Sequence, residues 1–103
     1  MATEERIPPT HPGEILKLDF LEPLKLSQRT LADALDVNPR RISEIVNGKR
    51  SVTADTALRL ARFFDVTPGF WLGLQKQYDL DVAEDALKGR LEREVKTKED
   101  VLA

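Results

Sequence analysis

Residues 27–48 read SQRTLADALDVNPRRISEIVNG, a pattern that predicts two short amphipathic helices joined by a tight corner. Ser27 is a good N-cap, because its hydroxyl can accept a backbone N–H of the first helical turn that has no helical partner. The helix that follows is expected over about 28–36, with its apolar side chains on one stripe. These side chains are Leu31, Ala32 and Leu35.

The corner is Asp36-Val37-Asn38, and it leads into a second helix over about 39–47. Asn38 is a natural N-cap, and Pro39 is tolerated at the first helical position because its missing N–H would have no helical partner there. Gly48 can supply the left-handed residue that ends the helix. At 100° per residue, three apolar side chains share the side that should face the core. They are Ile42, Ile45 and Val46.

The opposite side of the second helix is polar and charged. Arg40, Glu44 and Asn47 point most directly outward, with Arg41 and Ser43 on the flanks. Charge alone would suit any solvated helix, but the capped corner, the small Ala32 and the core spacing together resemble a helix-turn-helix. In that motif the second helix, the recognition helix, enters the major groove of DNA, where such side chains can contact base edges and phosphates.

The composition is that of a soluble single domain. The chain has 103 residues, of which 41 % are hydrophobic and 33 % charged. No apolar run approaches the ~20 residues of a membrane span, and the N-terminus has no secretory signal pattern. Cysteine is absent, which excludes disulfides and thiolate zinc sites and permits a reducing cytoplasm. The net charge is −2, yet residues 27–78 hold eight basic and five acidic side chains, so the basic excess lies with the helix-turn-helix.

The first 26 residues predict an extended lead-in over 1–9 and then one helix. His11-Pro12-Gly13-Glu14 opens this helix, with a proline at the first position and an acid in the first turn. Pro23 should limit it to about residue 22. His11 is the only histidine and has no partners at ligand or catalytic spacing, so a structural or capping role is expected. We expect no catalytic residue, metal site or cofactor.

After the motif, Lys49 and Arg50 lie in a short basic loop where they could reach phosphates, although a solvated loop is the alternative. Thr53 or Ser51 should cap a fourth helix, and Thr67-Pro68 should open a fifth. A last helix is expected over about 81–95, with Gly89 inside it, before a charged tail. The prediction is an all-α fold, a compact bundle of about five helices. We divide the chain into a lead-in (1–9), a helix-turn-helix domain (10–80) and a C-terminal helix and tail for dimerisation or partner contact (81–103).

The fifth helix carries more apolar surface than a small bundle needs, and such surplus area commonly marks a subunit contact. The candidates for a dimer contact there and in the last helix are Phe70, Trp71, Leu74, Tyr78 and Leu87.

Several segments together resemble one family. HPGEIL at 11–16, NGKR at 47–50, DTALRL at 55–60, and FWLGLQ at 70–75 with YDL at 78–80 stand in the order and spacing typical of HigA-type antitoxins. These belong to the larger class of Xre/lambda-repressor-like DNA-binding proteins. The resemblance covers about residues 8–87, and the first and last segments narrow the larger class to the HigA-like group.

The resemblance implies a bacterial cytoplasmic regulator with two activities. It would neutralise a HigB-like toxin, an mRNA endonuclease of the RelE type, and as a homodimer it would bind an inverted repeat in its own operator and repress transcription. By position, the candidates at base edges are Gln28, Asn38, Arg40, Ser43 and Glu44. The candidates on the DNA backbone are Arg41, Asn47, Lys49 and Arg50. Arginine commonly reads guanine and glutamate can accept from cytosine, so we expect a G·C-containing half-site.

Two other functions remain open from the sequence. One is a stand-alone dimeric repressor without a toxin partner, and the other is a protein-interaction module that does not read DNA. An enzyme is disfavoured, since the sequence has no cysteine nucleophile, no acid or metal-ligand spacing around its one histidine, and no glycine-rich phosphate-binding loop.

Overall fold

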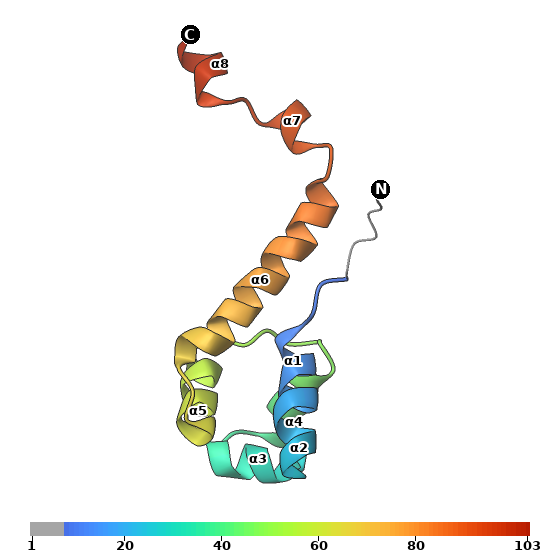
Figure 1. Ribbon diagram of the computed structural model, residues 1–103, viewed down its shortest axis with the longest axis vertical. Helices are drawn as coiled ribbons and strands as arrows, with labels where there is room; N and C mark the ends of the chain where they lie inside the picture. The colour runs from blue at the N-terminus through green and yellow to red at the C-terminus, as the bar shows by residue number, and fades with distance from the viewer. Residues whose placement is uncertain (1–7) are drawn as a thin grey trace.

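The computed structural model describes residues 8–103, and all the regular structure in that range is helical (Figure 1). A bundle at one end gives way to a long helix that projects from it, so that the molecule extends 57 × 34 × 22 Å. The all-α class is confirmed. The shape is less compact than expected, because the radius of gyration is 17.8 Å and a compact chain of this length has about 13 Å. Residues 1–7 of the expected lead-in lie outside the described residues.

The first helical region runs without interruption through three segments. They are α1 (Pro12–Ile15), the π-helical segment η1 (Leu16–Leu21) and α2 (Glu22–Leu24). The prediction that Pro23 ends the helix at about residue 22 was wrong by two residues. In the wider π turn the N–H of Glu22 donates to the carbonyl of Lys17, five residues back, and the helix ends only at Lys25, which has a φ of 54°.

The helix-turn-helix matches its prediction closely, with α3 at Gln28–Leu35 and α4 at Pro39–Val46. The Ser27 hydroxyl accepts the N–H of Thr30 at 3.0 Å, and Asn38 Oδ1 accepts the N–H of Arg40 at 2.8 Å. Gly48 has a φ of +74° and ends the second helix as expected.

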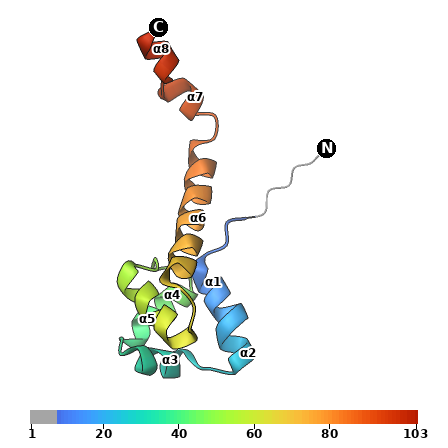
Figure 2. The same cartoon turned by 60° about the vertical axis from the view of Figure 1, so that its left-hand side comes forward.

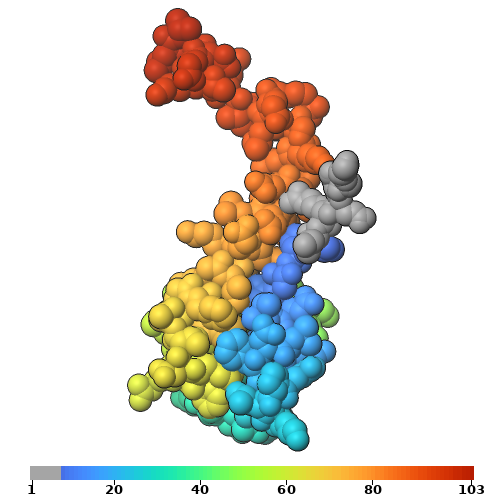
Figure 3. Space-filling model, viewed as in Figure 1, coloured from blue at the N-terminus to red at the C-terminus, as the bar shows by residue number. Residues whose placement is uncertain are grey.

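The C-terminal third differs from the prediction. After α5 (Ala54–Phe64), capped by Thr53, a single helix α6 runs over Pro68–Leu87. A separate helix over about 81–95 was therefore a wrong prediction. Gly89, with a φ of +79°, follows the end of α6, and only the short helices α7 (Leu91–Glu94) and α8 (Lys98–Leu102) come after it. Figure 3 shows the second half of α6 standing clear of the bundle.

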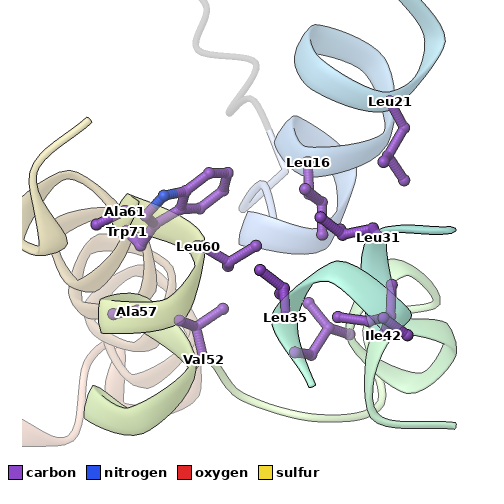
Figure 4. Close-up of a cluster of buried hydrophobic side chains, with 12 residues drawn as sticks. Leu16, Leu21, Leu31, Leu35, Ile42, Val52, Ala57, Leu60, Ala61 and Trp71 are labelled. Atoms are coloured by element: carbon purple, nitrogen blue, oxygen red, sulfur yellow. The ribbon is translucent and has the colours of Figure 1, made fainter. Parts of the chain in front are cut away.

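The core lies where the helices of the bundle meet (Figure 4). The predicted inward residues of α4, Ile42 and Ile45, are fully buried, and Val46 packs against the core. Trp71 is also fully buried, with its ring centroid 5.0 Å from that of Phe20. The prediction that Trp71 forms a dimer contact is therefore wrong, because its side chain offers no surface to a second subunit.

Gly13 brings the first helical region close to the end of α4. A Cβ atom at this position would overlap the backbone carbonyl of Ile45, so only glycine allows the two helices to approach this far. The N-terminal helix thus sets where the C-terminal end of α4 lies. Among the described residues, no helix combines the length and the apolar character needed to cross a bilayer.

Candidate nucleic-acid interface

The outward side of α4 is the candidate interface, and it lies in the bundle, at the opposite end of the molecule from α7 and α8 (Figure 2). Arg40 is the most exposed of its side chains, at 80 %, and Glu44 lies one turn further along the same face. Ile42 and Ile45 anchor the helix to the core on the other side. A polar face supported by a buried apolar face can meet a partner without losing its own packing.

Arg40, Glu44 and Arg50 form a cluster that we call the recognition triad. Arg40 Nε donates to Glu44 Oε2 at 3.1 Å, and Arg50 Nε donates to Glu44 Oε1 at 2.8 Å. The hydrogen bond from Arg50 is the main reason why the pKa of Glu44 is lowered. The triad brings the loop after α4 back onto the face of the helix, so the predicted contacts Arg40, Glu44 and Arg50 lie together.

The other predicted DNA contacts lie before α4, on its flank, in the loop after it and at the start of α3. Asn38 precedes α4 and is exposed, with its Oδ1 engaged by the N–H of Arg40. Ser43 is half-buried on the flank of α4, and Gln28 is half-buried at the start of α3. Asn47 and Lys49 are exposed at the end of α4 and in the loop after it.

Arg41 lies apart from these residues, in a second cluster that we call the scaffold triad: Arg41, Asp55 and Arg59. Asp55 Oδ1 accepts from Arg41 Nη1 at 2.9 Å and from Arg59 Nε at 2.8 Å. Both hydrogen bonds, that from Arg59 first, lower the pKa of Asp55. Arg59 Nη1 also donates to the backbone carbonyl of Leu35 at 2.8 Å, which connects α5 to the end of α3. Arg41 thus links α4 to α5, and the structure does not group it with the predicted backbone contacts.

Sequence reasoning missed Gln75, which holds the loop after α4 in place. This side chain is buried on α6, where its Oε1 accepts the N–H of Val52 at 2.8 Å and its Nε2 donates to Asp79 at 2.9 Å. The available signal was an amide one turn after Trp71, which places it on the same side of α6 as that tryptophan. Gln75 therefore attaches the segment that carries Lys49 and Arg50 to α6.

His11 has the capping role that was expected of it. Its Nδ1 accepts the N–H of Gly13 at 2.9 Å, and its ring lies edge-on to Tyr78, with centroids 4.9 Å apart. Burial lowers the pKa of His11, while Asp79 and the backbone carbonyl of Arg50 oppose this shift. In residues 8–103, no group of three or more potential ligand side chains is placed to hold a metal ion.

Comparison with known proteins agrees with this arrangement. A family model described as "Helix-turn-helix" matches residues 19–71, just over half of the chain. Virulence-associated protein I of Dichelobacter nodosus is 51 % identical over 83 residues, covering 81 % of this chain and 77 % of the relative.

Two solved structures share both sequence and fold. An addiction module antidote protein of the HigA family from Coxiella burnetii is 46 % identical, with a TM-score of 0.84 over 88 % of this chain and 99 % of the relative. The antitoxin HigA of Pseudomonas aeruginosa, solved with the higBA promoter, is 40 % identical, with a TM-score of 0.84 over 87 % of this chain and 98 % of the relative. The chain therefore belongs to the helix-turn-helix family and, within it, to the HigA-type antitoxins.

Proposed function

We propose that this protein is an antitoxin that neutralises a HigB-like, RelE-type toxin and binds the operator of its own operon to repress transcription. Antitoxins of its family that are similar along nearly their whole length support this proposal, and one of them was solved with promoter DNA. The proposed activity places the protein in the bacterial cytoplasm, where both DNA and mRNA are found.

The observation that carries the DNA-binding part is the face of α4. A capped helix is held by two buried isoleucines and presents arginine, glutamate and asparagine outward. The loop after it brings Arg50 to the same side, where it contacts Glu44, and also carries the exposed Lys49. Base edges in the major groove offer donors and acceptors to such side chains, and phosphates attract the two cations.

We further propose that the protein acts as a homodimer on an inverted repeat, with its two recognition helices about one DNA turn, ~34 Å, apart. Of the predicted contacts, Phe70 is 38 % exposed, and Leu74, Tyr78 and Leu87 are each partly buried in the single chain. The second half of α6 also exposes Leu80, at 53 %. Apolar side chains on a projecting helix favour a partner there.

A binding role is favoured over catalysis by the engagement of the one histidine. The Nδ1 of His11 accepts a backbone hydrogen bond, and its ring packs against Tyr78. A general base needs an unshared nitrogen close to a substrate, and this geometry uses the ring for helix capping instead.

The first test co-expresses the chain with the product of the neighbouring gene and follows growth and co-purification. We expect a stable complex and restored growth. A gel shift on the upstream region, with a scrambled duplex of the same length as control, should show selective binding. Selective binding without a toxin partner would replace the antitoxin proposal with a stand-alone repressor. A stable complex without DNA binding would leave a protein-interaction module.

A further inference from the structure

The recognition triad places a negative charge in the middle of a surface that we propose for a polyanion. The Glu44 carboxylate uses one oxygen for Arg40 and the other for Arg50, at 3.1 and 2.8 Å. Its side chain is 29 % exposed, so it lies at the surface, between its two cations. The lowered pKa of Glu44 keeps this carboxylate ionised at neutral pH.

The carboxylate leaves few cations on this surface without a counterion. Arg41 is already engaged by Asp55 in the scaffold triad, at 2.9 Å. Arg40 and Arg50 share the charge of Glu44, so the triad as a whole carries one net positive charge. Of the predicted DNA contacts that are cationic, only Lys49 has no ion pair among those found in the described residues. The affinity for an arbitrary duplex depends on the number of cations that contact phosphates, so this arrangement holds that number down.

Glu44 acts differently on different DNA sequences. Every duplex presents the same phosphates, so the repulsion between them and the carboxylate weakens binding to all sequences alike. A donor for the carboxylate exists only at some base pairs, such as the N4 amino group of cytosine in the major groove. A repulsive group that is offset only in the correct complex raises specificity without raising affinity.

On the basis of the proposed operator binding, we propose that Glu44 is a specificity-determining residue that suppresses binding to arbitrary DNA. In the free protein its carboxylate holds Arg40 and Arg50. On arbitrary DNA it keeps opposing the phosphates and limits the contacts that the two arginines make. On the operator a donor group of a base forms a hydrogen bond to the carboxylate. Arg40 and Arg50 are then released and contact guanine or phosphate.

The test compares Glu44→Gln with the wild-type chain on the operator and on a scrambled duplex, across a series of salt concentrations. Glutamine keeps the size of the side chain and one acceptor oxygen, and it removes the charge. The matched control is Asp65→Asn, which also removes one negative charge, from an exposed residue at the end of α5 that is outside the predicted DNA and dimer contacts. A thermal melt of each variant confirms that the fold is intact.

We expect Glu44→Gln to bind the scrambled duplex about three- to tenfold more tightly, with a salt slope steeper by about 0.9 for each arginine released. The operator should gain less, so the ratio of the two affinities falls. Equal gains on both duplexes, no gain on scrambled DNA, or the same gain in Asp65→Asn would overturn the inference. If the wild-type chain does not prefer its operator, the proposed function itself fails, and this is seen before any variant is made.

Discussion

The two triads contain the same groups, one carboxylate between two arginines, and differ in what they connect. The scaffold triad joins residues 14 positions apart, and Arg59 extends it to the carbonyl of Leu35, so it spans three helices. The recognition triad joins Arg40, Glu44 and Arg50, which all lie within α4 and the loop directly after it. The scaffold triad connects three helices of the bundle, and the recognition triad arranges charge on a single surface.

The difference shows that an ion pair has no fixed role in this protein. Exposed ion pairs within one helix add little to the stability of a fold and are screened by salt. A contact between elements, or to the last carbonyls of a helix, restricts how those elements move relative to each other. We therefore expect substitutions in the scaffold triad to change stability and substitutions in the recognition triad to change DNA binding.

The largest effect should come from the packing of α1 against α4, because α4 carries Arg40 of one triad and Arg41 of the other. In Gly13→Ala the new methyl group meets the backbone carbonyl of Ile45, which cannot give way as a flexible side chain could. We expect a loss of about 3 kcal/mol in the free energy of unfolding, at the upper end of the cost of overpacking. Chemical denaturation measures it. An unchanged midpoint would show that α1 and α4 separate easily.

The next effect isolates the recognition triad. Arg40→Ala should lower operator affinity by about 1–3 kcal/mol and relax sequence preference, because a base contact is lost. Stability should stay within about 0.5 kcal/mol, as for most surface substitutions. Binding to operator and scrambled duplexes, with a melt alongside, gives both quantities. Equal losses on the two duplexes would reduce Arg40 to a phosphate contact.

The scaffold triad should respond in the opposite way. Arg59→Gln removes the hydrogen bond to the Leu35 carbonyl at the end of α3 and one ion pair to Asp55. We expect a loss of about 1 kcal/mol in the free energy of unfolding, a typical net value for one hydrogen bond. The ratio of operator to scrambled affinity should not change. A change in that ratio at unchanged stability would remove the distinction between the triads.

The smallest effect concerns the pH dependence of stability that comes from His11, whose ring interacts with the backbone of Arg50 in the loop after α4. Burial lowers the pKa of His11 in the fold, so the unfolded chain binds a proton more readily than the folded one does. Stability is then fully present above the ordinary pKa of about 6.5 and falls as pH decreases through the lowered value. His11→Asn keeps a capping acceptor and cannot titrate, so its melting temperature should fall less between pH 7.5 and pH 5. Equal falls would show that His11 does not contribute to acid sensitivity.

The parts of the fold that the sequence predicted best are set by local signals. Ser27, Asn38-Pro39 and Gly48 act within one turn of their own position, so both helices of the motif could be placed to within about a residue. The predicted boundary between residues 80 and 81 falls inside α6, but no proline or positive-φ residue interrupts that helix, and Gly89 follows its end.

The scaffold triad and Gln75 could not be predicted in the same way. Arg41 and Asp55 are 14 residues apart, and Val52 and Gln75 are 23 apart. Their meeting depends on how α4, α5 and α6 pack, which periodicity along one helix does not specify. The wrong prediction for Trp71 has the same cause, because the packing of the bundle buries this side chain within its own chain.

Because α6 is one unbroken helix of 20 residues, its two halves keep a fixed rotational phase. Gln75 fixes that phase at the bundle, where its side chain accepts a hydrogen bond from the N–H of Val52. Each residue beyond this point turns the face of the helix by 100° and advances it by 1.5 Å. Inserting a single residue between 80 and 87 would therefore turn the side chains of the far end by 100° about the helix axis and leave the bundle untouched. The direction in which the side chains at that end point, relative to α4, is therefore set by the number of residues as well as by their chemistry.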